Sequence, residues 1–267
     1  MSKAPLKVLV IGATGSIGRL VVAAAIRQGH AVRAILRRRE KALTLAPEAE
    51  VFIGDLTRPE SLVNAAIGID AVVFTHGSDG AGKVGAENVD YGGVRNILRA
   101  LGQQKARIAL MTAIGVTDRL GSYNQSTEAH DWKRRSERLV RASGLPYTIV
   151  RPGWFDYNKP DEHQLVFLQG DTRHAGNPSD GVIAREQIAQ VLVASLTSEA
   201  ALRKTFELVA TKGSAQSDIE PLFAALEPDI ENGTDGVRDV SNMPLEEEPK
   251  RVRDDMAAIQ AASGDRR

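Results

Sequence analysis

Cysteine is absent from this sequence of 267 residues. Its absence excludes disulfide bonds, thiolate catalysis, iron–sulfur clusters and cysteine-ligated zinc, and it suits a reducing compartment. Long apolar runs are absent as well, and none approaches the roughly 18 residues that a transmembrane helix needs. The start of the chain shows no cleavage site after a longer hydrophobic core. We therefore expect a cytoplasmic protein that does not enter a membrane.

An excess of charge of either sign is also missing, because 34 Lys and Arg residues balance 34 Asp and Glu residues. Such a chain is not expected to bind nucleic acid or a membrane surface in general. The balance hides an asymmetry, since residues 214–267 hold 6 basic and 13 acidic residues, whereas residues 1–213 hold 28 and 21. The sequence predicts an acidic C-terminal tail at 227–267, with a helical pattern at 246–262 and a candidate role in binding a protein partner.

The histidines give no metal-binding pattern. They are scattered at positions 30, 76, 130, 163 and 174, without the short paired spacings that metal sites use. A Gly-x-Ser-x-Gly turn, which would mark a serine nucleophile in an α/β hydrolase, is also missing. We therefore expect neither a metal ion nor acyl-transfer chemistry.

Short β-branched segments alternate with amphipathic helical patterns along most of the chain, as in βαβ units that build a parallel sheet. Strands are predicted at 7–11, 31–36, 50–53, 71–75, 107–111, 147–150 and 206–209. A first helix carries Ile17 to Ala25 and ends near Gly29, and further helices are predicted at 60–67, 87–102, 128–143, 185–198 and 218–226. Several strands are apolar throughout, which indicates burial on both faces. The predicted fold is α/β, a doubly wound Rossmann-type parallel sheet with helices on both faces.

One domain is expected over residues 1–226. Residues 76–86 and 152–182 lack clear periodicity and follow strand ends, where open α/β sheets bind their ligands. The substrate region is therefore predicted mainly at 152–182, with a small C-terminal part at 205–226.

A glycine-rich turn joins the first strand to the first helix. Gly12 suits a tight turn, Gly15 allows a pyrophosphate to approach the backbone, and Gly18 allows the helix to pack against the strand. The start of the helix supplies free N–H groups for the phosphates, with further contacts expected from Thr14, Ser16 and Ile17. The turn therefore predicts a dinucleotide site.

The residues after the second strand predict which dinucleotide binds. NAD-specific Rossmann domains usually place an acidic residue there for the ribose 2′-hydroxyl. This chain has Arg37 and Arg38, which can hydrogen-bond a 2′-phosphate or stack on the adenine. We therefore predict NADP(H) as the cofactor, with NAD(H) disfavoured.

Together these segments resemble the short-chain dehydrogenase/reductase superfamily, and within it the atypical NmrA-like, NAD(P)H-binding group. The resemblance covers about residues 6–226 and rests on GATGSIG at 12–18, IGDL at 53–56, VDYGGVRN at 89–96, KRRSE at 133–137 and ASGLPYTIVRPG at 142–153. It implies that Asp55 binds the adenine amino group beside the Leu56 backbone. It also implies contacts to the two riboses and the nicotinamide from Thr75, His76, Gly77, Lys133, Pro152 and Gly153.

The chain departs from this family at the reacting centre. Catalytic members carry a tyrosine four residues before the lysine and a Ser or Thr at the end of the fifth strand. Here the tyrosine position is Ala129, whereas Thr112 is placed to supply the hydroxyl. Lys133 and Thr112 are therefore the predicted catalytic residues. Three other side chains stay open as possible acids: Tyr123, Tyr157 and His130. For His130, a position on the helix surface is the favoured interpretation.

Aromatic residues make up only 4% of the chain, yet Trp154, Phe155 and Tyr157 fall within four positions at a strand end. They are candidates for the apolar wall of a substrate pocket, and a core plug beneath the following loop is equally compatible. The arginines at 134, 135, 138 and 141 are interpreted as the exposed face of their helix.

These features predict an NADPH-dependent oxidoreductase that acts on a small carbonyl, quinone or flavin-like acceptor. A quinone or flavin would need no tyrosine acid, because solvent can supply the proton. The alternative is a non-catalytic NADP(H)-binding redox sensor or regulatory protein. An isomerase or epimerase is disfavoured, because such relatives use the missing tyrosine. The protein is expected to be a monomer or a dimer.

Overall fold

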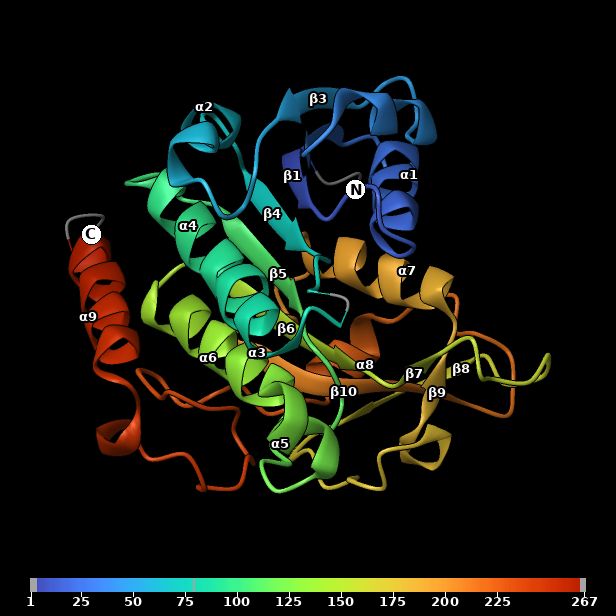
Figure 1. The fold of residues 1–267 in the computed structure, drawn as a ribbon. Coiled ribbons are helices and arrows are strands. Elements are labelled where there is room, and N and C mark those ends of the chain that lie inside the picture. Colours follow the sequence, from blue (N-terminus) through green and yellow to red (C-terminus); the bar gives the residue numbers. More distant parts are fainter. Residues whose placement is uncertain (1–3, 79, 265–267) are drawn as a thin grey trace.

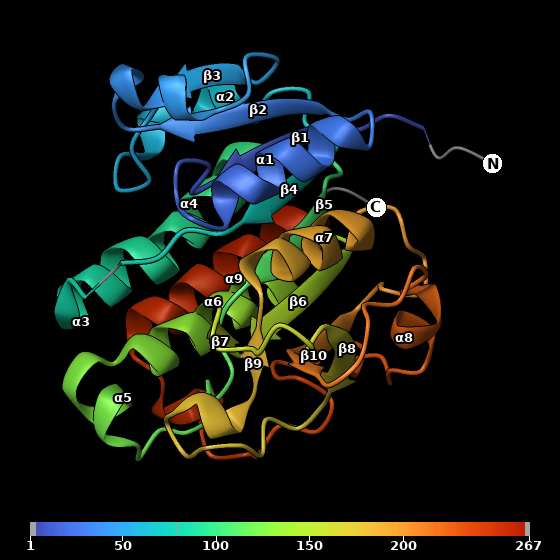
Figure 2. The same cartoon turned by 90° about the vertical axis from the view of Figure 1, so that its right-hand side faces the viewer.

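The computed structural model describes residues 4–78 and 80–264. Their strands form one sheet in the order β3-β2-β1-β4-β5-β6-β10-β9-β7, with β8 paired to β10. Helices cover both faces of this sheet (Figures 1 and 2). The predicted Rossmann-type α/β fold is therefore confirmed.

All seven predicted strands are present, each within two residues of its predicted bounds, and every pairing between neighbours among them is parallel. Their bounds are Lys7–Ile11 (β1), Ala31–Leu36 (β2), Glu50–Ile53 (β3), Ala71–Phe74 (β4), Arg107–Met111 (β5), Tyr147–Pro152 (β6) and Lys204–Thr211 (β10). Alternation along β1 supplies both sides of the sheet, because Val8 and Val10 enter one core and Leu9 and Ile11 the other.

The segment 152–182 is more regular than its sequence suggests. It contains β7 (Trp154–Phe155), β8 (Gln164–Leu168) and β9 (Val182–Ile183), and β8 and β9 pair antiparallel to β10. Phe167 of β8 stacks on Phe206 of β10 at 4.4 Å between ring centroids. Strands β7 and β9 have two residues each, too few for alternation to show, so tertiary pairing decides their structure.

Helices pack on both faces of the sheet. One face is covered by α1 (Gly18–Arg27) and α7 (Arg185–Ser195), and the other by α2 (Val63–Ala66), α4 (Gly92–Leu101), α6 (Ala129–Ala142) and α9 (Lys250–Gly264). Three further short helices are α3 (Gly82–Gly85), α5 (Ser122–Thr127) and α8 (Glu220–Ala224). None of the helices within the described ranges is long and apolar enough to cross a membrane.

Several turns are helical without being α-helical. A π-helical segment, Ala86–Tyr91, leads into α4, so the predicted helix at 87–102 has two parts. Tighter 3₁₀ turns lie at Arg39–Thr44, Pro59–Ser61, Pro178–Asp180 and Leu245–Glu247.

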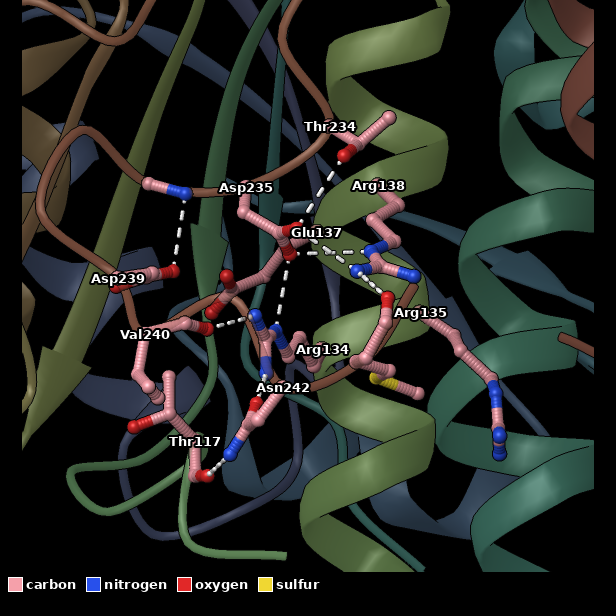
Figure 3. A network of polar contacts seen from close by, with 12 residues as sticks. Thr117, Arg134, Arg135, Glu137, Arg138, Thr234, Asp235, Asp239, Val240 and Asn242 are labelled. Carbon is pink, nitrogen blue, oxygen red and sulfur yellow. Dashed lines mark hydrogen bonds and ion pairs between the residues drawn. The ribbon is translucent and has the colours of Figure 1, made fainter. Parts of the chain in front are cut away.

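The arginines of α6 are buried, so the prediction of an exposed face is wrong. Arg134 and Arg138 are 0% and 1% exposed, and Arg135 and Arg141 are also buried. They form ion pairs with carboxylates of the acidic C-terminal segment, residues 227–248, which lies along α6 (Figure 3). A run of arginines has the same pattern on a solvated face as on an ion-paired one, so the sequence could not distinguish them.

Asp235 and Glu248 each bind two of these arginines. Oδ1 of Asp235 accepts from Nε of Arg134 at 2.9 Å and from Nε of Arg138 at 3.0 Å. Glu248 accepts from Arg135 at 2.7 Å and from Arg138 at 2.9 Å. The acidic segment is therefore bound to its own domain through the charges that suggested a partner.

Two further carboxylates complete this network. Asp229 accepts from Nε of Arg141 at 3.1 Å, and Asp239 accepts from Nη1 of Arg151 in β6 at 2.7 Å. Burial alone would raise the pKa of Asp235 and Asp239, but the facing guanidinium groups outweigh it and hold both pKa values below their ordinary range.

Asp235→Asn tests how much the network stabilises the fold. The variant leaves Arg134 and Arg138 buried with one charged partner fewer, so we expect the free energy of unfolding to fall by about 3 kcal/mol. Asp254→Asn is the matched control, because Asp254 pairs with Lys250 on the surface of α9 and should contribute less than about 0.5 kcal/mol. Urea denaturation measures both values, and equal losses would contradict the assignment.

Candidate functional site

A cavity of about 1150 Å³ lies at the carboxyl ends of the central parallel strands. The ends of β1, β2, β4, β5 and β6 all reach it, as expected for an open α/β sheet. Two predicted site residues, Gly18 and Arg38, are not part of its lining. The others do line it: Gly12, Thr14, Gly15, Ser16, Ile17, Arg37, Asp55, Leu56, Thr75, His76, Gly77, Thr112, Lys133, Pro152, Trp154, Phe155 and Tyr157.

Two positions of the turn between β1 and α1 accept only glycine. Gly12 has a φ of +83°, and a Cβ on it would lie 2.7 Å from the backbone nitrogen of His76. A Cβ on Gly18 would lie 2.0 Å from the carbonyl oxygen of Gly12. Gly18 therefore serves the packing of α1 behind the turn, which explains its absence from the cavity. The turn, which has no room for a Cβ at Gly12 or Gly18, and the start of α1 suit a pyrophosphate.

The other end of the nucleotide region is framed by β2 and β3. Arg37 follows β2 and is exposed at the cavity edge. Asp55 follows β3, and its Oδ1 accepts from the backbone nitrogen and the hydroxyl of Thr57 at 2.9 and 2.8 Å. The hydrogen bonds from Thr57 hold the pKa of Asp55 below its ordinary range, so the carboxylate is charged at neutral pH.

His76 is a neutral imidazole within the cavity wall. Its Nε2 lies 3.0 Å from the carbonyl oxygen of Val89 in the π-helical segment, while its Nδ1 is buried and has no hydrogen-bond partner within the described part of the chain. Burial lowers the pKa of His76 to about 4. In the neutral ring Nε2 donates to the carbonyl oxygen of Val89, so Nδ1 is the accepting nitrogen.

Lys133 is held by a buried carboxylate. Its Nζ lies 2.8 Å from Oδ1 of Asp90, which is 4% exposed, and Oδ2 of Asp90 accepts from the Ser78 hydroxyl at 2.6 Å. This pairing fixes the ammonium group at the cavity wall. Asp90 lies inside one of the segments that carry the family resemblance, but its contact with Lys133 is visible only in the fold.

The Thr112 hydroxyl donates its hydrogen to a carboxylate of the protein. Its hydroxyl donates to Oε1 of Glu137 at 2.8 Å, and that buried carboxylate also accepts from Nε of Arg151 at 3.0 Å. The hydroxyl oxygen can still accept a hydrogen bond, whereas its hydrogen is used in the bond to Glu137.

The aromatic residues follow the end of β6, whereas Arg37 follows β2, and strands β1, β4 and β5 lie between the two. Trp154 and Tyr157 are 36% and 62% exposed and meet edge to face at 6.0 Å. Phe155 is partly buried against the core on the α1 side, and its ring lies 5.3 Å beneath the guanidinium of Arg185. All three residues line the cavity, and Phe155 also contacts the core.

Several lining residues escape sequence reasoning. Arg185, at the start of α7, donates to the Ser16 hydroxyl at 3.1 Å and pairs with Asp156. It lies 169 positions from Ser16, and no local pattern connects the two. Arg173 and His174 also line the cavity without a signal in the sequence. Tyr123 and His130, left open above as possible acids, line it as well. In residues 4–78 and 80–264, no group of three or more His, Cys, Asp or Glu side chains could hold a metal ion.

Comparison with known proteins identifies related sequences. Residues 12–199 match the model of a family described as NAD(P)H-binding. An uncharacterized sugar epimerase of Bacillus subtilis (strain 168), YhfK, is 31% identical over 208 residues, which cover 76% of this chain and 94% of that protein. The photosystem II assembly factor Ycf39 of Cyanophora paradoxa is 29% identical over 224 residues, which cover 83% of this chain and 68% of that protein.

Solved structures share the fold. A protein of Bacillus halodurans, described provisionally as an NAD-dependent epimerase/dehydratase, superposes with a TM-score of 0.69 at 22% identity. The superposition covers 82% of this chain and 99% of that chain. At this identity the likeness supports the Rossmann fold alone.

Gly12→Ala tests whether the glycine turn is a nucleotide cradle. Gly29→Ala is a matched control, because Gly29 has the same φ of +83° but a Cβ there meets nothing within 4 Å. Both variants carry the same backbone strain, about 1–2 kcal/mol. Only Gly12→Ala also displaces the turn against His76, so we expect it to weaken NAD(P)H binding at least tenfold, about 1.4 kcal/mol, in a fluorescence titration. Equal affinities in the two variants would refute the cradle.

Proposed function

This chain belongs to the NAD(P)H-binding family, which confirms its resemblance to the atypical short-chain dehydrogenase/reductases, and we propose that it is an NADPH-dependent reductase of a small carbonyl, quinone or flavin-like acceptor. The observation that carries the proposal is the glycine turn in the lining of the cavity. The same lining includes Arg37 and the aromatic residues Trp154 and Tyr157. Pockets for drug-sized ligands measure about 300–1000 Å³. The cavity of about 1150 Å³ exceeds this range, as a site for a dinucleotide and a small acceptor should.

The preference for NADPH rests on Arg37. No carboxylate within residues 4–78 and 80–264 forms an ion pair with its guanidinium, and no acidic side chain occupies the end of β2. A planar guanidinium with free donors suits the 2′-phosphate of NADP(H) by bidentate, charge-assisted hydrogen bonds. Arg38 lies outside the cavity lining, so Arg37 is the proposed specificity residue.

The remaining residues have proposed roles along the cavity. Asp55 with Leu56 receives the adenine, and Thr75, His76 and Gly77 line the riboses. Lys133, fixed by Asp90, supplies donors and a positive charge beside the nicotinamide ribose and Pro152. Trp154 and Tyr157 offer ring faces to a planar acceptor. When bound, NADPH supplies the hydride.

A regulatory, non-catalytic role is the second candidate. Ala129 removes the usual acid, and Thr112 directs its hydrogen to Glu137. The photosystem II assembly factor Ycf39, a relative of this chain, is named for a role in assembly, which supports this candidate. The epimerase named in Bacillus subtilis gives less support to a sugar epimerase here, because the tyrosine that such chemistry uses is absent.

Arg37→Ala tests the cofactor preference. We expect the wild-type protein to bind NADPH at least tenfold more tightly than NADH, about 1.4 kcal/mol, and the variant to lose most of this ratio because the 2′-phosphate loses its charged partner. Arg39→Ala removes an equal charge two positions away and serves as the control. Fluorescence titration with both nucleotides measures the ratio, and an unchanged ratio in Arg37→Ala would assign the preference elsewhere.

A further inference from the structure

The cavity contains a histidine that the proposed function leaves unused. His130 is the second residue of α6 and lies three positions before Lys133, so the two side chains share a helix face. Both line the cavity. His130 is only partly exposed, so its expected position on an open helix surface is wrong.

Neighbouring groups fix the ring of His130. The Tyr123 ring lies 5.2 Å away between centroids at an angle of 60°. On another side is Gly115, where an added Cβ would come within 3.7 Å of the imidazole Cε1. The backbone of Gly115 is itself held, because its nitrogen donates to Oδ1 of the buried Asp171 at 2.6 Å. The imidazole is therefore confined between an aromatic ring and a fixed loop.

One nitrogen of the confined ring lacks a partner. Nδ1 of His130 is buried and makes no hydrogen bond within the described part of the chain. Buried polar atoms are nearly always hydrogen-bonded, so this nitrogen keeps an unused hydrogen-bonding capacity on a side chain that lines the cavity. His76 has the same property, but it lies against Gly12 in the nucleotide cradle rather than at the acceptor end.

The surroundings keep His130 neutral at pH 7. Burial lowers its pKa, and the Lys133 ammonium lowers it further, while Asp171 and the carboxylate and backbone of Asp118 act in the opposite direction. The positive end of the α6 dipole also disfavours an imidazolium in the first turn. Because the net pKa lies below the ordinary value, the ring is mainly neutral at pH 7 and takes up a proton only at lower pH.

Other groups near the acceptor are less suited to carry a proton. The Lys133 ammonium is paired with Asp90, and the Thr112 hydrogen is directed to Glu137. The Tyr157 ring is 62% exposed at the rim. Position 129 offers only a methyl group.

We propose that His130 binds the oxygen of a carbonyl acceptor through Nδ1 and exchanges a proton with it. This inference rests on the proposed reductase function. In the reduction, the carbonyl carbon receives a hydride from NADPH, the C=O π bond breaks, and the oxygen takes the proton from Nδ1 of the imidazolium. NADPH becomes NADP⁺, the carbonyl becomes an alcohol, and solvent returns a proton to the imidazole.

The proposal separates two classes of acceptor. An aldehyde needs a proton at its oxygen as the hydride arrives, whereas a quinone can take its protons from water after reduction. Reduction of an aldehyde should therefore become faster as the pH falls toward the lowered pKa of His130, and this dependence should be absent for a quinone.

The test compares His130→Gln with the wild type and with His163→Gln, a histidine outside the cavity lining. Substrates are 4-nitrobenzaldehyde and menadione, with NADPH affinity measured separately by fluorescence. We expect His130→Gln to lower kcat/KM for the aldehyde about 100-fold and to abolish its pH dependence, with menadione reduction and NADPH affinity within about threefold of wild type. Equal aldehyde reduction in His130→Gln and wild type, while both bind NADPH, would overturn this inference alone. A wild-type protein that fails to bind NADPH, or that reduces neither probe, would overturn the proposed function and this inference together.

A second readout does not depend on turnover. Ring-nitrogen NMR of the histidines, with the His130 signal assigned by its loss in His130→Gln, should show a neutral ring at pH 7. Addition of 4-nitrobenzyl alcohol should shift the Nδ1 signal, because the alcohol hydroxyl donates to it. A signal that stays unchanged at saturating alcohol would contradict the contact, even in a catalytically active protein.

Discussion

The pairing of the buried α6 arginines with carboxylates of residues 227–248 is the interaction on which the site depends. One side of α6 carries Lys133 and His130 toward the cavity, while Arg134 and Arg138 are buried on another side. An unpaired guanidinium in such a place would cost several kcal/mol. The helix that presents the cavity residues is therefore held by a segment about a hundred positions further along the chain.

The same network reaches the cavity by two routes. Asp239 binds Arg151, Arg151 binds Glu137, and Glu137 accepts the hydrogen of Thr112 in the cavity wall. Separately, Nδ2 of Asn242 donates to the carbonyl oxygen of Thr117 at 3.1 Å, next to the loop residues Gly115 and Asp118 that line the cavity. The match to the family model ends at residue 199, so Asp239 and Asn242 come from a part of the chain beyond it.

Local pattern predicted the features that depend on neighbouring residues. The apolar runs gave all seven main strands, and the turn from Gly12 to Gly18 could be placed because strand, glycines and helix follow one another directly. Pattern failed where the partner is distant in sequence. The α6 arginines look the same whether water or Asp235 faces them, and nothing near Arg185 indicates its contact with Ser16. The partial burial of His130 was also missed, because it depends on packing against Gly115 and Tyr123, which the helical pattern does not show.

A crystal structure of the protein with NADPH is the most direct test of the central claim, that this cavity binds the dinucleotide in the orientation set by the glycine turn. The account predicts the pyrophosphate over Gly12 and Gly15, the 2′-phosphate within about 3 Å of the Arg37 guanidinium, and the nicotinamide between Pro152 and Lys133. A nucleotide bound in the reverse orientation, or bound outside this cavity, would contradict it.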